Sequence, residues 1–198
     1  MKKLPIHNEQ YRNLIESFGS YLKTMGYNQG TQNMLPSCLR EFLHQMEKQG
    51  INQIQSVKPN HIQNHYEYLQ TRPNQRRSGN LSGSMLNHHM YAIRKFFAYQ
   101  EQMGIIASDP SSQLEFKRQK SEAREILTPE EITALYQAAE TLKDKAILGM
   151  FYGCGLRRSE GEKLNINDIN FKSGLLFVQK GKGNKSRTIP INKQIVND

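Results

Sequence analysis

Apolar residues recur every three or four positions in four stretches of the first hundred residues, which predicts four amphipathic helices. We expect the second helix to begin near Leu35, because Pro36 would break an interior turn. Gly26, Gly50 and Gly104 follow three of the stretches and predict where those helices end. The apolar stripes are Tyr11, Leu14, Ile15, Phe18 and Leu22; Leu35, Leu39, Phe42, Leu43 and Met46; Ile62, Tyr66 and Leu69; and Leu86, Met90, Ile93 and Phe97.

Capping residues predict where helices begin. Pro59 suits the first turn of the third helix, where proline loses no hydrogen bond, and Ser82 or Ser84 can cap the fourth. Thr128-Pro129-Glu130-Glu131 forms a capping box, because the first and last of these side chains can each accept a backbone N–H of the other residue. This box starts a further helix, whose expected apolar face consists of Ile132, Leu135 and Tyr136.

The pattern changes to short strands after Leu164. A helix expected from about Leu142 to Tyr152 ends at the glycines that follow it, and we interpret Tyr152 as a core residue. Three strand segments then alternate with turns at residues 172–174 and 181–184, and Pro190 fits the end of an edge strand. The strand segments are marked by Ile169 and Phe171, by Leu175 to Val178, and by Thr188 and Ile189.

Residues 107–125 have no clear period and interrupt the helical pattern before the capping box. We interpret the stretch as an interdomain linker, because an aperiodic polar segment is typical of such connections. The expected organisation is a helical unit over residues 1–110, a linker over 111–125 and an α+β unit over 126–198.

The chain is basic, and this points to a polyanionic partner. It has 27 Lys and Arg against 18 Asp and Glu, a net charge of +9. Charge alone does not separate nucleic acid binding from a merely basic protein, nor duplex DNA from RNA. Cations collect in a loop at residues 72–80, on the fourth helix, in the linker and around the last turn. The candidate DNA-binding residues are Arg72, Arg76, Arg77, Arg94, Lys95, Lys117, Arg118, Lys120, Lys180, Lys185 and Arg187.

Several other classes of protein and site do not fit. No apolar run approaches the ~18 residues of a spanning helix, so we expect no membrane association, and no signal peptide follows Met1, so we expect a cytoplasmic protein. We expect Cys38 and Cys154 to be free thiols. The adjacent pair His88-His89 fits a polar helix face better than a metal site, because neighbouring helical side chains point in different directions. Phe96, Phe97 and Tyr99 fit core packing better than base stacking.

Two short segments resemble the tyrosine recombinases of the phage integrase family. They are Gly155-Leu156-Arg157-Arg158-Ser159-Glu160 and the turn from Lys180 to Pro190, and Leu127 to Ile132 resembles the opening of the family's catalytic domain. The region from Tyr91 to Phe97, followed by Asp109-Pro110, is similar to the end of the family's core-binding domain. The resemblance implies a mainly α fold: a SAM-like four-helix core-binding domain, then the first part of an α+β catalytic domain with a three-stranded antiparallel sheet.

The resemblance also implies roles for single residues in DNA cleavage. Arg157 matches the first catalytic arginine, and an arginine fork suits the charge that builds up on a phosphate. Glu160 matches the acidic residue that orients this arginine. Lys182 matches the lysine that protonates the leaving oxygen, with Lys180 and Lys185 as alternatives because the spacing is slightly longer than usual. Gly161 departs from the apolar residues usual in the family and weakens a helix there.

The second half of the family's active site does not occur in this sequence. No His is followed three positions later by Arg, and all nine tyrosines lie at or before Tyr152, so the chain offers no nucleophile at the family's position. For the full-length protein the resemblance implies strand cleavage and rejoining through a phosphotyrosine, self-association on paired DNA sites, and no metal or cofactor. We expect this chain alone to act as a non-catalytic module that binds duplex DNA.

Overall fold

The computed structural model describes residues 4–75, 77–116, 125–179, 181 and 185–191. The chain divides into two compact units, residues 1–123 and 124–198. We describe each unit by itself. Within the described residues, no helix combines the length and the apolar content that crossing a bilayer requires.

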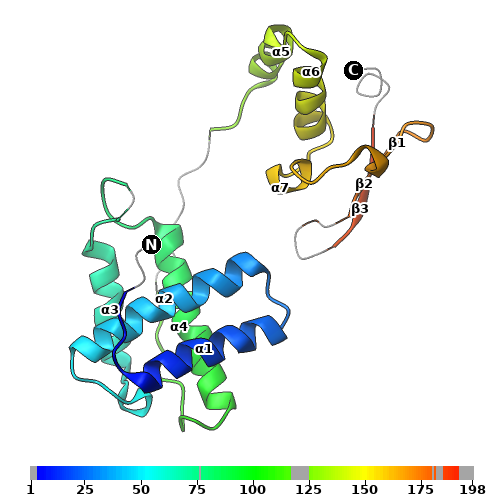
Figure 1. Cartoon of the computed structure of the whole chain (residues 1–198). Coiled ribbons are helices and arrows are strands. Elements are labelled where there is room, and N and C mark those ends of the chain that lie inside the picture. Colours follow the sequence, from blue (N-terminus) through cyan, green and yellow to red (C-terminus); the bar gives the residue numbers. More distant parts are fainter. Residues whose placement is uncertain (1–3, 76, 117–124, 180, 182–184, 192–198) are drawn as a thin grey trace. The chain divides into compact units, whose positions relative to one another are not determined.

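The first unit is a helical bundle, as the apolar stripes predicted. Helix α2 contacts both α1 and α4 (Figure 1), and the apolar stripes of all four α-helices meet in one core. Phe96 and Phe97 are fully buried in this core, as expected, while Tyr99 stacks on Tyr21 at its edge with a centroid distance of 4.3 Å. The elements are α1 (Glu9–Thr24), α2 (Gln29–Lys48), η1 (Ile54–Ser56), α3 (Pro59–Thr71) and α4 (Gly83–Gln102).

The expected start of the second helix was wrong. Helix α2 begins at Gln29, where the Asn28 side chain accepts the backbone N–H of Thr31 at 3.0 Å, and Pro36 lies inside it. The Pro36 ring faces α1 next to Gly19, where an added β-carbon would lie 4.0 Å from its Cγ. Packing against α1 therefore offsets the free-energy cost of the hydrogen bond that proline removes. Helix preferences based on the local sequence do not include this tertiary contribution.

The first unit extends past the boundary that we expected at residue 110. Ser111 is buried, and Leu114 and Phe116 pack against the core of the bundle. Arg94 on α4 donates to the backbone oxygen of Leu114 and lies over the Phe116 ring, 5.6 Å from its centroid. Residues 111–116 thus belong to the bundle, and the rest of the expected linker, residues 117–124, lies outside the described residues.

The second unit begins with the expected capping box and ends in a three-stranded antiparallel sheet. The Thr128 N–H donates to Glu131 Oε2 at 2.8 Å, and the Glu131 N–H donates to Thr128 Oγ1 at 3.3 Å. Strand β2 lies between β1 and β3 (Figure 1), and Pro190 ends the edge strand β3 opposite Leu175. The elements are α5 (Pro129–Ala138), α6 (Leu142–Leu148), η2 (Gly149–Gly153), α7 (Arg158–Gly161), η3 (Ile166–Asp168), β1 (Ile169–Asn170), β2 (Leu175–Val178) and β3 (Arg187–Pro190).

The described core of the second unit is small. Helices α5 and α6 bury no side chain fully, and the expected core residue Tyr152 is 56% exposed, so that expectation was wrong. The helix expected over residues 142–152 is present, but α6 ends at Leu148 and the last turn, Gly149–Gly153, is π-helical. The buried apolar residues of this unit are Cys154, Leu156, Leu176, Val178 and Ile191.

Candidate active site and basic surfaces

Arg157 and Glu160 meet at the start of the short helix α7. Gly155 adopts a positive φ of 60° that turns the chain, and the buried Leu156 anchors it in the core. The Arg157 N–H then donates to Glu160 Oε2 at 2.8 Å, and Arg157 Nη1 donates to Glu160 Oε1 at 2.9 Å. The Glu160 side chain is 3% exposed and that of Arg157 is 54% exposed, so the carboxylate holds the guanidinium from the protein side.

Arg187 on β3 binds the same carboxylate. Its Nη1 donates to Glu160 Oε1 at 2.7 Å and its Nη2 donates to Glu160 Oε2 at 2.8 Å, a two-pronged contact. We expected Arg187 to bind DNA, but both of its terminal nitrogens donate hydrogen bonds to Glu160. The sequence analysis missed this contact because the two residues are 27 positions apart.

The arginines set the protonation state of Glu160. The hydrogen bonds from Arg187, followed by those from the backbone and side chain of Arg157, lower the pKa of this carboxyl to about 2 against the opposing effect of burial. Glu160 therefore stays charged at every physiological pH. One negative charge between two guanidinium groups leaves the cluster with a net positive charge, which suits a phosphate.

The turn between β2 and β3 starts beside this cluster. The Gly181 N–H donates to the backbone oxygen of Lys185 at 2.9 Å, and an added β-carbon at Gly181 would lie 3.1 Å from Glu160 Oε1 and 3.3 Å from Arg187 Nη1. Lys185 is exposed, whereas Lys180 and Lys182 lie outside the described residues. The structure thus brings together Arg157, Glu160 and the first residue of the lysine turn.

A small hollow next to Glu160 does not extend the site into a binding pocket. It has a volume of about 200 Å³ and includes the buried Asp168, which accepts the Asn165 N–H at 3.0 Å. Small-molecule sites usually enclose about 300 to 1,000 Å³. The hollow is therefore too small for a nucleotide, and the charged cluster faces solvent instead.

Arg72 was expected in an exposed basic loop, and this expectation was wrong. Its side chain is 7% exposed; its Nε lies 2.5 Å from Glu41 Oε1, and its Nη2 donates to Glu41 Oε2 at 2.9 Å. Glu41 comes from the middle of α2 and is itself buried. A buried guanidinium needs such a partner, so Arg72 anchors the start of the loop inside the bundle and is not available to DNA.

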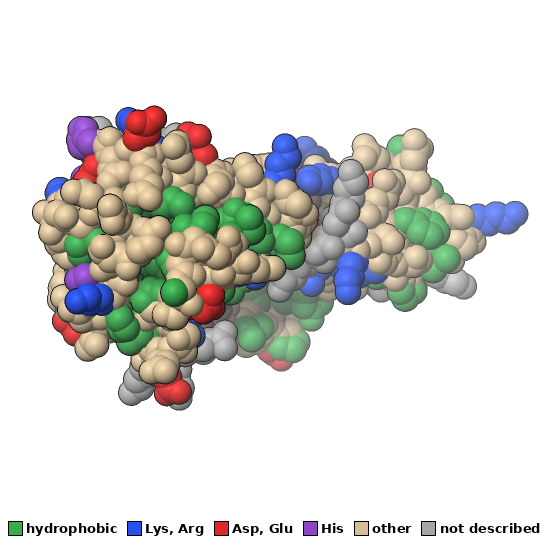
Figure 2. All heavy atoms as spheres, turned by 90° about the horizontal axis from the view of Figure 1, so that it is seen from below, with side chains coloured by type: hydrophobic (Ala, Val, Ile, Leu, Met, Phe, Trp, Pro, Cys, Tyr) green, Lys and Arg blue, Asp and Glu red, His purple; other side chains and the backbone are tan. Residues whose placement is uncertain are grey.

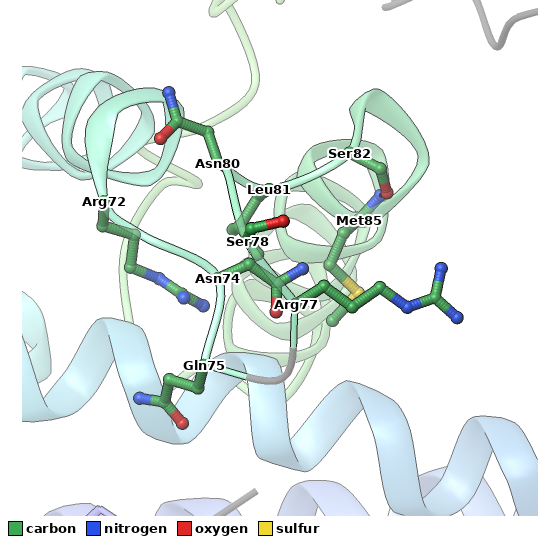
Figure 3. A pocket seen from close by; sticks show the side chains of 9 residues that line it. All are labelled: Arg72, Asn74, Gln75, Arg77, Ser78, Asn80, Leu81, Ser82 and Met85. Atoms are coloured by element: carbon green, nitrogen blue, oxygen red, sulfur yellow. The ribbon is translucent and has the colours of Figure 1, made fainter.

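The other described residues of this loop lie around a hollow of about 430 Å³. Figure 3 shows Arg77 pointing away from Arg72, past Met85. The loop closes on itself, since the Asn74 N–H donates to the Gly79 oxygen at 2.9 Å. Arg77 is exposed and remains a candidate for DNA, and Arg76 lies outside the described residues.

The two candidate cations on α4 have partners within the bundle. Arg94 is exposed but bonds to the segment at residues 114–116 described above. Lys95 lies 5.9 Å from the ring centroids of both Tyr21 and Tyr27. The hydrogen bond to Tyr27 raises the pKa of Lys95, so this side chain keeps its charge.

His89 is a core residue, contrary to the expected polar face. It is fully buried, and Nε2 lies 3.7 Å from Glu41 Oε2. Burial lowers its pKa to about 4 and lowers the pKa of the neighbouring His65 well below 6.5, so both rings are neutral at pH 7. Across the described part of the chain, no group of three His, Cys, Asp or Glu side chains could hold a metal ion. Cys38 and Cys154 are free and buried.

Figure 2 shows Lys and Arg side chains of the described residues lying in small groups among side chains of other kinds. Lys117, Arg118 and Lys120, which we expected to contact DNA, lie outside the described residues.

Comparison with known sequences identifies tyrosine recombinases among the relatives of this chain. The pattern of the phage integrase family matches residues 125–197. Tyrosine recombinase XerA of Pyrococcus horikoshii is 28% identical over 183 residues, which cover 92% of this chain and 57% of the relative. Tyrosine recombinase XerD of Listeria innocua is 32% identical over 111 residues, 53% of this chain and 37% of the relative. The chain thus spans only part of the length of the curated relatives it matches.

A solved structure shares the fold. The integrase of the Tn1549 transposon, in complex with transposon right end DNA, superposes with a TM-score of 0.66 at 17% identity, covering 93% of this chain and 62% of that one. Its likeness confirms the expected mainly α fold with a three-stranded antiparallel sheet. The pattern match over residues 125–197 and the sequence relatives thus show that this chain is similar to the tyrosine recombinases of the phage integrase family.

Proposed function

We propose that the protein to which this chain belongs is a site-specific DNA recombinase, and that this chain binds duplex DNA through phosphate contacts. The observation that carries the proposal is the exposed guanidinium of Arg157, held from behind by the buried carboxylate of Glu160. An oriented arginine with one side open to solvent is suited to binding a phosphate. The relatives that match this chain are tyrosine recombinases, and the Tn1549 integrase is seen bound to DNA.

In the full-length protein, each member of the cluster has a separate role. Arg157 stabilises the charge that develops on the phosphate oxygens during cleavage, and Glu160 orients it. Lys182 acts as general acid toward the departing 5′ oxygen, with Lys180 and Lys185 as the alternatives on the same turn. A tyrosine attacks the phosphate, and self-association on paired sites brings together the strands to be exchanged.

The exposed cations outside the cluster hold the DNA backbone. Arg77 in the loop before α4 and Lys185 in the lysine turn are open to solvent, and Arg94 and Lys95 offer charge on α4. We include Arg76, Lys117, Arg118 and Lys120 on their charge and their place in the sequence. Arg72 is withdrawn from this set because Glu41 neutralises it in the core.

By itself this chain binds DNA without cleaving it. Its sequence contains no His-x-x-Arg motif and no tyrosine after Tyr152. Groups that act together in one site are strongly non-additive, so half of the catalytic groups do not retain half of the rate. We therefore assign DNA binding without cleavage to this chain, and strand exchange to the full-length protein.

Two measurements test the proposal. Fluorescence anisotropy with a labelled duplex should show an affinity that falls steeply with salt, each neutralised phosphate adding about −0.9 to the slope of log K against log salt. Arg157→Ala should lower the affinity more than the matched variant Arg158→Ala, whose side chain is 88% exposed and paired with Glu162. An affinity that does not respond to salt, or an equal affinity for duplex RNA, would contradict DNA backbone binding.

The second measurement concerns cleavage. The chain is incubated with a nicked suicide duplex, which traps a covalent protein–DNA adduct, and the products are separated under denaturing conditions. We expect no adduct. An adduct would show that one of the nine tyrosines acts as a nucleophile, and it would refute the non-catalytic assignment.

A further inference from the structure

The terminal nitrogens of Arg187 are engaged differently from those of Arg157. Both terminal nitrogens of Arg187 bond to Glu160, and 34% of its side chain is exposed. In the described part of the chain, the Arg157 side chain bonds to Glu160 through Nη1 alone and is 54% exposed. The carboxylate therefore fixes one arginine completely and leaves the other partly free. The first is placed to position the site, and the second is placed to meet a ligand.

We propose that Arg187 is a positioning residue: through Glu160 it ties the lysine turn between β2 and β3 to the helix that carries Arg157, and it is not itself a DNA contact. The inference rests on the proposed function, in which Arg157 and a lysine of this turn act on one phosphate. Nothing in the resemblance to the family assigned this role to Arg187, and its charge alone suggested a DNA contact.

The contact at Gly181 connects the ion pair to the turn. A β-carbon at this residue would lie 2.9 Å from the Lys185 oxygen, 3.1 Å from Glu160 Oε1 and 3.3 Å from Arg187 Nη1, so only glycine lets the backbone come this close. The Gly181 N–H closes the turn on Lys185 at 2.9 Å. The ion pair thus fixes the position of Gly181, the described residue that precedes Lys182 in the sequence.

The shape of the guanidinium explains why arginine is needed here. Two parallel N–H groups of the guanidinium donate to both carboxylate oxygens. They fix the relative orientation of the guanidinium and the carboxylate as well as the distance between them. A lysine would supply the same charge as a single point and would leave the direction open. The role of Arg187 therefore depends on its fork, while a phosphate contact would depend chiefly on its charge. This difference makes Arg187→Lys the informative variant.

The first test needs no DNA. Amide hydrogen exchange at Gly181, followed by NMR, reports how firmly the turn is closed. Loss of an ordinary hydrogen-bonded contact corresponds to about tenfold faster exchange, and we expect this for both Arg187→Ala and Arg187→Lys. Arg158→Ala removes an exposed arginine of α7, the helix that carries Glu160. This variant should leave the exchange rate of the Gly181 amide within about twofold of that in the unchanged chain. Unchanged exchange in Arg187→Lys would overturn the proposal.

The second test separates positioning from direct binding. The affinity for a labelled duplex is measured for the unchanged chain, Arg187→Ala, Arg187→Lys and Arg158→Ala. If Arg187 positions the turn, the Lys variant should lose as much affinity as the Ala variant. If Arg187 contacts phosphate, the Lys variant should bind like the unchanged chain, and the proposal is wrong. An unchanged chain that binds no duplex would instead refute the proposed function, and the exchange experiment would then decide the role of Arg187 alone.

Discussion

Gly161, the last residue of α7, packs directly against the ring of Phe151. A β-carbon at residue 161 would lie 2.5 Å from Phe151 Cζ and 2.9 Å from Cε1, closer than any real contact of this kind. The glycine that weakens the helix in isolation therefore makes room for an aromatic ring from the preceding π-helical turn. This packing supports the helix that carries Glu160.

Gly161→Ala should destabilise the second unit, although the same exchange in an open helix gains up to about 1 kcal/mol. The added methyl forces the Phe151 ring out of its place, and because this ring is 38% exposed we expect a cost of about 1 kcal/mol, the low end of the range for overpacked cores. Hydrogen exchange of peptides from residues 154–178, read by mass spectrometry, measures the change. In the Phe151→Ala background the same substitution should be neutral or stabilising. An equal loss in both backgrounds would show that Phe151 is not the cause.

The state of Glu160 predicts how the second unit responds to acid. Its pKa is lowered from 4.5 to about 2 in the folded chain, so its stabilising contribution is complete above about pH 4.5 and is lost as the pH falls toward 2. A carboxyl titration by NMR should place the Glu160 pKa near the lower value. Arg187→Ala should raise it more than Arg157→Ala does, because the bonds from Arg187 contribute most to the shift. The reverse order would contradict the two-pronged contact.

The buried pair of Arg72 and Glu41 should be essential to the bundle. Arg72→Met leaves the Glu41 carboxylate buried without its partner, and breaking a buried pair in this way costs about 3 to 5 kcal/mol. Urea unfolding followed by far-UV circular dichroism, to which the four long helices contribute most, measures the loss. Arg77→Ala in the same loop is the control and should change stability by less than about 0.5 kcal/mol. The double variant Glu41→Met with Arg72→Met should lose less than Arg72→Met alone.

His65 and His89 make the bundle sensitive to mild acid. Burial keeps both rings neutral in the folded chain, with the pKa of His89 lowered from 6.5 to about 4, while the unfolded chain takes up protons near 6.5. Stability is therefore complete above about pH 6.5 and falls as the pH drops toward 4. The pKa of Glu41 is raised by burial, so its contribution changes in the opposite sense and offsets part of the loss at lower pH.

Urea unfolding at several pH values between 7 and 4 measures this dependence. His89→Leu removes one of the two titrating rings and should flatten the curve over that interval. A slope as steep as that of the unchanged chain would assign the pH dependence to other groups. The amide of Gln45 also adjoins His65, and because an amide side chain has no titratable proton it leaves the prediction unchanged.

The sequence by itself determined the features that depend on near neighbours. The apolar stripes located four helices, the capping box located the start of α5, and turn residues located three strands, because each signal arises within a few positions along the chain. The contact between Arg157 and Glu160 was implied by the resemblance to the family, and it too is local, since three positions separate the two residues. Likewise, the four residues of β2 were the four predicted as a strand segment between two turns.

Only the tertiary structure decided which distant residues meet. Arg72 and Glu41 are 31 positions apart and Arg187 and Glu160 are 27 apart, so no periodic pattern could show that two predicted DNA contacts bind carboxylates instead. Pro36 remains inside α2 because α1 packs against it. The physical reason is common to these cases. Whether a charge is free or neutralised, and whether a helix tolerates a proline, depends on which groups packing brings within a few ångströms, and that packing joins elements whose separation along the chain carries no local signal.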